Sequence, residues 1–212
     1  MENLRRQYTQ CGLKESDLCG CPFEQFRLWF EDAQHRIEDD FFEPNAMALA
    51  TSNKKGEVSN RVVLLKGFDE KGFRFFTNYE SSKAKDLEEN PNGSLLFYWP
   101  QIERQIRIAG GVVKTDRAVS RQYFDSRPRE SRISAVISPQ SRPVENRQVL
   151  EEAAAKESEQ VSGGEIELPD YWGGYRVTPT LFEFWQGREN RLHDRLQYTS
   201  CDGRWEIQRL GP

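Results

Sequence analysis

Short apolar runs that alternate with glycine-containing turns restrict this chain of 212 residues to a mainly antiparallel β architecture. The turn sequences at 53–56, 69–72 and 202–203 each end in glycine, which adopts the positive φ that tight hairpins need. Hairpins join antiparallel neighbours, so the runs predict antiparallel strands. The predicted strands span residues 46–51, 58–68, 73–77, 94–99, 105–114, 174–178, 181–186, 191–199 and 205–210.

Helical patterns precede and interrupt these strands. A helix begins at Pro22, and its apolar residues recur at the spacing of one buried helix face. Further helices are predicted over residues 81–90, 116–126 and 145–160. So many strands exceed what one flat sheet holds, so we expect an α+β protein built on a closed or split antiparallel β-barrel with flanking helices. Gly110 and Gly111, inside one strand, indicate a β-bulge.

Composition narrows the class of protein. A net charge of −4 disfavours a dedicated nucleic-acid binder, whose surface is strongly basic. No run reaches the roughly 18 apolar residues of a membrane span, and the N-terminus has no apolar signal core, so a soluble, cytoplasmic protein is expected. Polar residues 1–21 predict a mobile arm, and residues 22–212 one domain.

Cysteines near the N-terminus raise the question of a metal site or disulfides. Cys11, Cys19 and Cys21 are three of the four cysteines in the chain. A Cys-x-Cys pair lacks the two-residue spacer of zinc knuckles, and a domain of this size does not need disulfides for stability. We therefore expect free thiols and no metal.

Several basic and hydroxyl residues are placed as anion ligands. Arg61 and Lys66 bracket an apolar strand, and they reach one ligand only if the strand twists or ends between them. Lys83 lies at a predicted helix N-terminus, where free N–H groups and the helix dipole favour phosphate. The alternative interpretation is two solvated strand-end charges and an ordinary helix cap.

Tyr123, Arg127 and Ser131 recur every four residues on either side of Pro128, which breaks the helix. Two hydroxyls and a guanidinium at such a kink suit a monophosphate, although an exposed arginine-rich helix end explains the segment equally well. Gln105, Gln140 and Ser141 are neutral groups of the kind that hydrogen-bond a heteroaromatic ring.

The C-terminal segment gathers positive charge. If residues 191–198 form a strand, then Arg191, His193 and Arg195 share one face, and like charge biases His193 toward its neutral form. Three basic groups on one face predict an anionic ligand.

The sequence Phe182-Glu-Phe-Trp-Gln186, followed after four residues by Arg191-Leu-His-Asp-Arg195, resembles the signature of the pyridoxine (pyridoxamine) 5′-phosphate oxidase family. Similar blocks occur at 61–67, 73–78, 94–99, 103–105, 123–128 and 172–175. The resemblance implies a Greek-key, FMN-binding split β-barrel that forms a homodimer, with the flavin held between subunits.

The resemblance also implies roles for individual residues. FMN ligands would be Arg61, Val62, Val63, Leu64, Leu65, Lys66, Phe76, Thr77, Ser82, Lys83, Gln105, Gln140, Ser141, Trp185 and Arg195. Substrate ligands would be Lys66, Tyr123, Arg127, Ser131, Arg191 and His193, with Arg5 and Tyr8 in an N-terminal lid. Arg191 and His193 would be catalytic. Ser82 departs from the family, in which a basic residue is expected before the lysine.

The implied reaction oxidises pyridoxine or pyridoxamine 5′-phosphate to pyridoxal 5′-phosphate. Hydride passes from the substrate C4′ to flavin N5, and O2 reoxidises the flavin to give H2O2. Two other functions fit the same barrel: a different flavin- or deazaflavin-dependent reductase, and a non-catalytic protein that binds flavin or pyridoxal phosphate. The pairing of Arg191 and His193 with the phosphate clamp favours the oxidase over the reductase.

Overall fold

The computed structural model describes residues 8–9, 12–161 and 164–212. Its strands are β1 (Ala46–Ser52), β2 (Val58–Leu64), β3 (Gly67–Asp69), β4 (Gly72–Asn78), β5 (Asn92–Trp99), β6 (Arg104–Lys114), β7 (Trp172–Gln186), β8 (Asp194–Cys201) and β9 (Arg204–Leu210). Its helices are α1 (Pro22–Arg36), α2 (Ser82–Glu89), α3 (Arg117–Ser126), α4 (Arg129–Ile137) and α5 (Arg147–Gln160), with short 3-10 turns η1 (Glu15–Asp17), η2 (Pro100–Ile102) and η3 (Glu189–Arg191).

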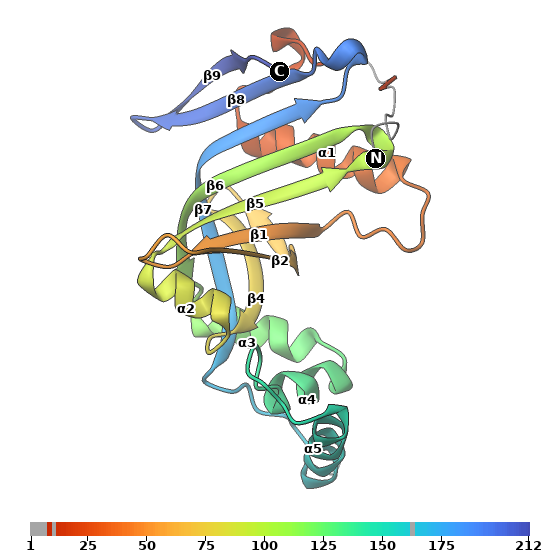
Figure 1. Ribbon diagram of the computed structural model, residues 1–212, viewed down its shortest axis with the longest axis vertical. Helices are drawn as coiled ribbons and strands as arrows, with labels where there is room; N and C mark the ends of the chain where they lie inside the picture. Colours follow the sequence, from red (N-terminus) through yellow and green to blue (C-terminus); the bar gives the residue numbers. More distant parts are fainter. Residues whose placement is uncertain (1–7, 10–11, 162–163) are drawn as a thin grey trace.

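The strands form one antiparallel sheet that divides along β7. The main path runs β2-β1-β5-β6-β7-β4-β3, while β8 also pairs with β7 and β9 with β8. On one edge β7 pairs with β6 over nearly its whole length, whereas on the other its first half pairs with β4 and its second half with β8. Figure 1 shows β4 beside the lower half of β7, while β8 and β9 continue the sheet beside its upper half. The predicted split barrel is confirmed.

The strand β7 is longer than the sequence pattern predicted. Two separate runs, 174–178 and 181–186, are parts of one strand that continues through Pro179. Its partner β6 shifts register between Ala109 and Gly110, which confirms the predicted bulge. A Cβ atom at Gly110 would collide with the carbonyl oxygen of Thr178, so the close approach of the two strands requires glycine.

The run 58–68, predicted as one strand, is two strands with a break at Leu65 and Lys66. β2 pairs with β1, whereas β3 pairs with β4 on the other side of the split. The chain crosses between the two halves of the barrel here, and Gly67 adopts a φ of 151° after the break. The hairpin glycines Gly56 and Gly203 have the predicted positive φ.

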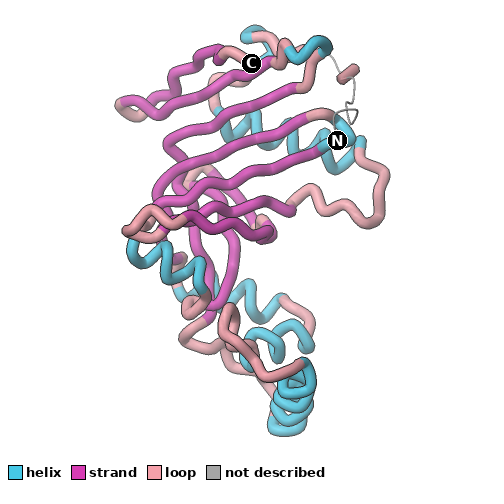
Figure 2. The backbone as a smooth tube through the Cα atoms, in the orientation of Figure 1, coloured by secondary structure: helices cyan, strands magenta, loops and turns pink. Residues whose placement is uncertain are grey.

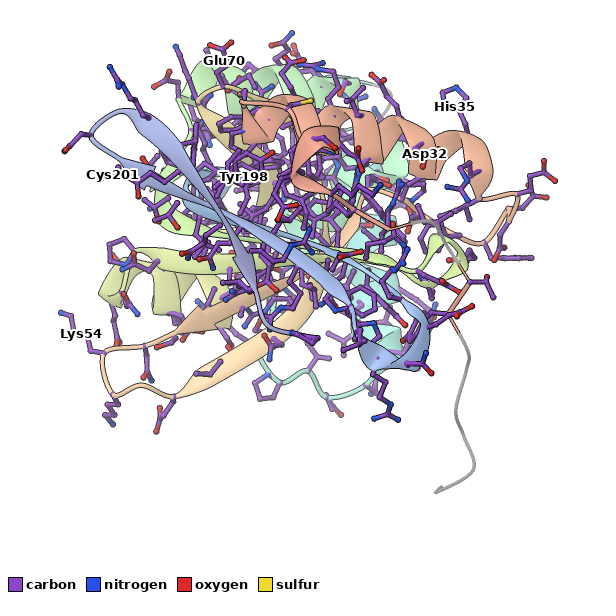
Figure 3. The ribbon with its side chains drawn as sticks, turned by 90° about the horizontal axis from the view of Figure 1, so that it is seen from above. Asp32, His35, Lys54, Glu70, Tyr198 and Cys201 are labelled. Atoms are coloured by element: carbon purple, nitrogen blue, oxygen red, sulfur yellow. The ribbon has the colours of Figure 1, made fainter. Side chains whose placement is uncertain are left out.

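Aromatic packing beneath α1 forms the main core. Phe26 of α1 is fully buried and its ring lies 4.8 Å from those of Phe68 and Phe73 and 5.0 Å from Phe97. Figure 3 looks down on this layer, with Tyr198 inside it and His35, Lys54 and Cys201 at the periphery.

A second, smaller core lies where α3 and α4 pack against the start of β7. It contains Phe124, Ile133, Leu168 and Trp172. Figure 2 shows the helices α3, α4 and α5 gathered at one end of the sheet. This lobe carries the predicted phosphate clamp, so the second core positions a candidate site.

None of the described helices is long and apolar enough to cross a membrane. Cys19, Cys21 and Cys201 are free thiols, and Cys11 lies outside the described residues. The described ranges contain no group of three or more His, Cys, Asp or Glu side chains arranged to hold a metal ion.

Replacing Phe26 tests the main core. Phe26→Ala leaves a cavity among the aromatic rings that surround it, so the free energy of unfolding should fall by about 3–5 kcal/mol in urea titration. Phe41, whose side chain is 97% exposed, is the matched control. Phe41→Ala should change stability by less than about 0.5 kcal/mol, and an equal loss in the two variants would contradict this description of the core.

Candidate functional site

A cavity of about 330 Å³ lies where β2, β4 and α2 meet the helical lobe. Four cationic side chains face it: Arg61, Lys66, Lys83 and Arg127. Among the described residues that line it there is no carboxylate. The remaining lining residues are Val62, Val63, Leu64, Phe76, Thr77, Tyr123, Gln140 and Trp172. A cavity that is lined by four cations and by aromatic rings suits an anionic aromatic ligand.

Lys83 is buried on α2 among neutral oxygen atoms. Its Nζ donates to the side-chain oxygens of Gln140 at 2.8 Å, Thr77 at 3.1 Å and Ser81 at 3.2 Å. Burial and the nearby Arg61 guanidinium lower the pKa of Lys83 to about 8. An ammonium group that is buried without a counter-ion is costly, and a bound phosphate would remove that cost.

Arg61 is held by the strands rather than free to reorient. Its guanidinium donates to the Leu49 carbonyl at 2.9 Å and to the Thr51 hydroxyl at 2.8 Å, and also contacts Ser59. Asp86 of α2 lies 3.9 Å away and neutralises part of its charge. Burial lowers the pKa of Arg61. Because β2 ends at Leu64, Arg61 and Lys66 line the same cavity. A strand that ends between them is one of the two arrangements predicted for a shared ligand.

Three stacked rings form one wall of the cavity. The Phe76 ring lies 4.1 Å from Tyr123 and 5.7 Å from Trp172, with nearly parallel planes. Arg127 lies over Trp172, its Cζ 4.9 Å from the ring centroid, and Lys66 Nζ is 5.9 Å from the Tyr123 ring. These contacts place Lys66 beside Tyr123, and Arg127 beside Trp172 in the same wall.

Arg127 carries an unused hydrogen-bond donor. Its Nη1 is buried and has no hydrogen-bond partner in the described part of the chain. Burial lowers the pKa of Arg127. It lies between α3, which ends at Ser126, and α4, which begins at Arg129, so the predicted kink is confirmed. An orphaned guanidinium donor at this position fits a phosphate oxygen.

Three other predicted residues are not among those that line the cavity. Ser131 is in the first turn of α4, and Ser141 follows Gln140 with a φ of 68°. Ser82 is exposed at the first position of α2. The helix cap is Ser81, whose hydroxyl donates to the Asn78 carbonyl at 2.7 Å instead of capping the helix.

A second group of predicted residues lies across three neighbouring strands. Gln105 on β6 pairs with Trp185 on β7, and Trp185 pairs with Arg195 on β8. Paired residues share one face of a sheet, so these side chains stand in a row. Their sequence neighbours Ile106, Phe184 and Leu196 are fully buried in the core on the opposite face.

His193 lies beside this row in contact with aromatic rings. Its ring is 4.7 Å from Trp185 and 5.2 Å from Tyr8, and Tyr8 is 5.7 Å from Trp185. The Arg188 backbone N–H donates to its Nδ1 at 3.1 Å. Burial and the neighbouring Arg191 lower the pKa of His193 while Asp194 opposes them, so the neutral form is favoured as predicted.

The prediction that Arg191, His193 and Arg195 share one strand face is wrong. The strand β8 begins at Asp194, and Arg191 belongs to the turn η3. Asn190 and Arg191 have φ values of 54° and 62°, which no strand accommodates. Leu192, between Arg191 and His193, is exposed.

Arg195 is neutralised by a buried acid that sequence reasoning did not single out. Its Nε donates to Glu183 at 2.8 Å, and the other oxygen of Glu183 accepts from Arg107. Glu183 is 5% exposed, and hydrogen bonds from the two arginines outweigh burial and lower the pKa of its carboxyl. The pattern Glu183-Phe-Trp185 places Glu183 and Trp185 on one strand face, which was the available signal.

The two groups of predicted residues lie at opposite ends of β7. Trp172, at its first position, lines the cavity, and Trp185, near its last, contacts His193. Thirteen residue steps at the rise of a strand separate them by roughly 40 Å along β7. Within one chain the cavity residues therefore form one group, and a second group consists of Gln105, Trp185, His193 and Arg195. The two groups lie far apart. Arg5 lies outside the described residues.

The fold and the cavity define an α+β split barrel with a cationic, aromatic-walled pocket. Residues 33–160 match the family described as pyridoxamine 5′-phosphate oxidase, and residues 172–212 match the pyridoxine 5′-phosphate oxidase C-terminal dimerisation region. The chain therefore belongs to the pyridoxamine 5′-phosphate oxidase family.

Individual relatives extend over the whole chain. Proteins named pyridoxine/pyridoxamine 5′-phosphate oxidase are 53% identical in Crocosphaera subtropica, over 99% of this chain and 98% of theirs, and 48% identical in Synechocystis sp., over 100% and 98%. The structure of PhzG from Burkholderia lata 383, in complex with tetrahydrophenazine-1-carboxylic acid, has a TM-score of 0.89 at 28% identity, over 98% of this chain and 100% of that one. A pyridoxamine 5′-phosphate oxidase-related, FMN binding protein from Nostoc punctiforme has a TM-score of 0.69 at 20% identity, over 88% and 97%, and shares the fold.

Proposed function

We propose that this protein is an FMN-dependent oxidase that converts pyridoxine or pyridoxamine 5′-phosphate to pyridoxal 5′-phosphate. The observation that carries the proposal is the cavity in which Lys83, Lys66, Arg61 and Arg127 face stacked aromatic rings without a lining carboxylate. The names of relatives about 50% identical along the whole chain support the same reaction.

FMN fits the part of the cavity around α2. The buried Lys83 ammonium, with Arg61 beside it, would bind the flavin phosphate. Thr77 and Gln140 already hydrogen-bond each other and Lys83, so they are fixed for contact with the ligand. Ser82 supplies no charge here, so Lys83 carries more of the phosphate interaction than it would beside a second cation.

The substrate phosphate fits the part of the cavity nearest the helical lobe. Lys66, Tyr123, Arg127 and Ser131 would hold it, and the orphaned Nη1 of Arg127 supplies a donor that nothing else in the described chain uses. Binding energy gained at this remote phosphate is available to orient the pyridine ring.

FMN, when bound, supplies the oxidising chemistry, and O2 reoxidises the reduced flavin with release of H2O2. The chain's own residues orient the substrate. His193 accepts the Arg188 N–H at Nδ1, so in its neutral form the proton is on Nε2, which would donate to the oxygen or nitrogen at C4′. Arg191 would fix the ring by charge, and Trp185 with Tyr8 would exclude water from it.

A homodimer reconciles this assignment with the separation of the two residue groups. Each site would take its cavity from one chain and its Trp185, His193 and Arg195 from the partner. The face of the sheet that carries Trp185 also exposes apolar side chains on β2 and β5, with Val62 68%, Tyr98 56% and Leu96 36% exposed. This exposed apolar patch lies on the same sheet face as Trp185 and Arg195, which supports the formation of a dimer through this face.

The proposed activity is tested by adding FMN and then pyridoxine or pyridoxamine 5′-phosphate to the purified protein in air. Formation of H2O2 together with the pyridoxal phosphate chromophore is the expected result. Flavin binding without turnover would favour the non-catalytic binder, and reduction of another acceptor in place of O2 would favour a reductase. The fold alone does not separate these activities.

The pH dependence of FMN binding should report on Lys83. Its pKa of about 8 in the free protein rises when a phosphate binds, so binding takes up a proton above that pH. FMN affinity measured by fluorescence quenching should therefore be constant from pH 7 to about 8 and fall by up to about tenfold per pH unit above it.

The control for this measurement is Lys83→Met. The variant has no ammonium to titrate, so it should bind FMN more weakly at pH 7 and lose the decline above pH 8. The same decline in both proteins would show that another group controls FMN binding.

Subunit complementation tests the composition of the site from two chains. Lys66→Met removes a cavity residue and His193→Asn a residue of the aromatic group, so each homodimer should be nearly inactive. Random reassociation of the two variants makes half of the dimers mixed, each with one intact site, so about a quarter of the wild-type activity should return. Mixed dimers confirmed by distinct tags but without activity would contradict the shared site.

A further inference from the structure

Glu103 is a buried acid in a strained backbone conformation to which the proposed reaction assigns no role. It follows η2, is 2% exposed and has a φ of 57°. A non-glycine residue persists in the left-handed region only where its surroundings hold it. The Gly187 N–H at 2.8 Å and the Gln186 side chain at 3.1 Å both donate to its carbonyl oxygen, which fixes Glu103 at the end of β7.

The Glu103 side chain binds a distant part of the chain. The Thr9 backbone N–H donates to its Oε2 at 2.9 Å. A second carboxylate accepts a backbone N–H four residues after Thr9: the Leu13 N–H donates to Asp194 Oδ2 at 3.0 Å. Arg209 completes this attachment: it donates to Asp194 Oδ1 at 2.6 Å and to the Leu13 carbonyl at 3.0 Å.

Tyr8 is the side chain that these attachments place. It precedes Thr9 and meets the rings of Trp185 and His193 edge to face, with interplanar angles of 79° and 86°. Gly187 lies directly beneath it, where a Cβ atom would collide with the Tyr8 ring. The position of Tyr8 thus depends on two features. Gly187 leaves room for its ring, and the Glu103 carboxylate accepts the backbone N–H of Thr9, the next residue.

We propose that Glu103 and Asp194 are positioning residues, which hold Tyr8 against Trp185 and His193 as a preformed aromatic wall for the substrate's pyridine ring. That the bound ring is a pyridine rests on the proposed function. The attachment of Tyr8 through Glu103 and Asp194 does not depend on it. If the wall is already ordered in the free protein, substrate binding does not carry the entropic cost of ordering Tyr8. Loss of this order should therefore raise KM more than it lowers kcat.

Two substitutions of Glu103 form a matched pair. Glu103→Gln keeps the length and an oxygen acceptor for the Thr9 N–H. Glu103→Asn suits the left-handed backbone but is one methylene too short to reach Thr9. In Glu103→Asn, hydrogen exchange at the Thr9 amide should accelerate at least about tenfold and KM for the phosphorylated substrate should rise about fivefold, with kcat within about twofold. Glu103→Gln should restore both values toward wild type.

A double-mutant cycle with Tyr8→Ala separates positioning from a general structural role. If Glu103 acts through Tyr8, Glu103→Asn should change KM by less than about 1.5-fold in the Tyr8→Ala background. An equal change of KM in both backgrounds, or lost amide protection with an unchanged KM, would overturn the proposal. If Glu103→Asn does not fold, Thr9→Pro removes the same hydrogen bond from its exposed side and should raise KM alike.

Failure of the proposed function would be recognised independently. A wild-type protein that oxidises neither phosphorylated substrate refutes the oxidase assignment, whereas the exchange rates of the Thr9 and Leu13 amides need no substrate. Unprotected amides in the wild-type protein would refute the attachment whatever the activity.

Discussion

The long strand β7 determines both the shape of the protein and the composition of its site. It pairs with β6 on one edge and divides the other edge between β4 and β8. One of its ends contributes Trp172 to the cationic cavity, and the other presents Trp185 beside His193. A rigid strand cannot fold these ends together, so a site that needs both must recruit a second chain.

Charge is arranged differently at the two ends. Around the cavity, the buried Lys83 and the half-buried Arg127 contact neutral groups and an aromatic ring, so their positive charge remains available to a ligand. At the other end, the single carboxylate of Glu183 pairs with both Arg107 and Arg195, which makes that surface less basic than its sequence indicates. Under the proposed function, the cavity would bind the phosphate groups, while the strand end would offer aromatic surface and directed hydrogen bonds.

Much of the cavity could be predicted from local sequence because its residues lie on segments with clear patterns. Arg61 and Lys66 bracket a strand, and Pro128 fixes the kink beside Arg127, so short-range rules sufficed. The turn at Arg191 was missed because two consecutive non-glycine residues with positive φ have no sequence signal that outweighs an alternating strand pattern. Glu103 was missed because its role depends on Thr9, a contact across 94 positions.

The pairing of β4 with β7 also sets the order in which the molecule can be completed during synthesis. Phe73 pairs with Val177, a partner about 100 residues later in the chain, and such contacts form slowly. The cavity wall that Trp172 provides is therefore absent until β7 has been synthesised. The hydrogen-bond partners of Arg61 and Lys83 lie between Leu49 and Gln140, so both cations can be held in place before this wall exists. The cationic residues of the pocket therefore precede Trp172 in the chain, and the pocket is closed only when β7 has been added.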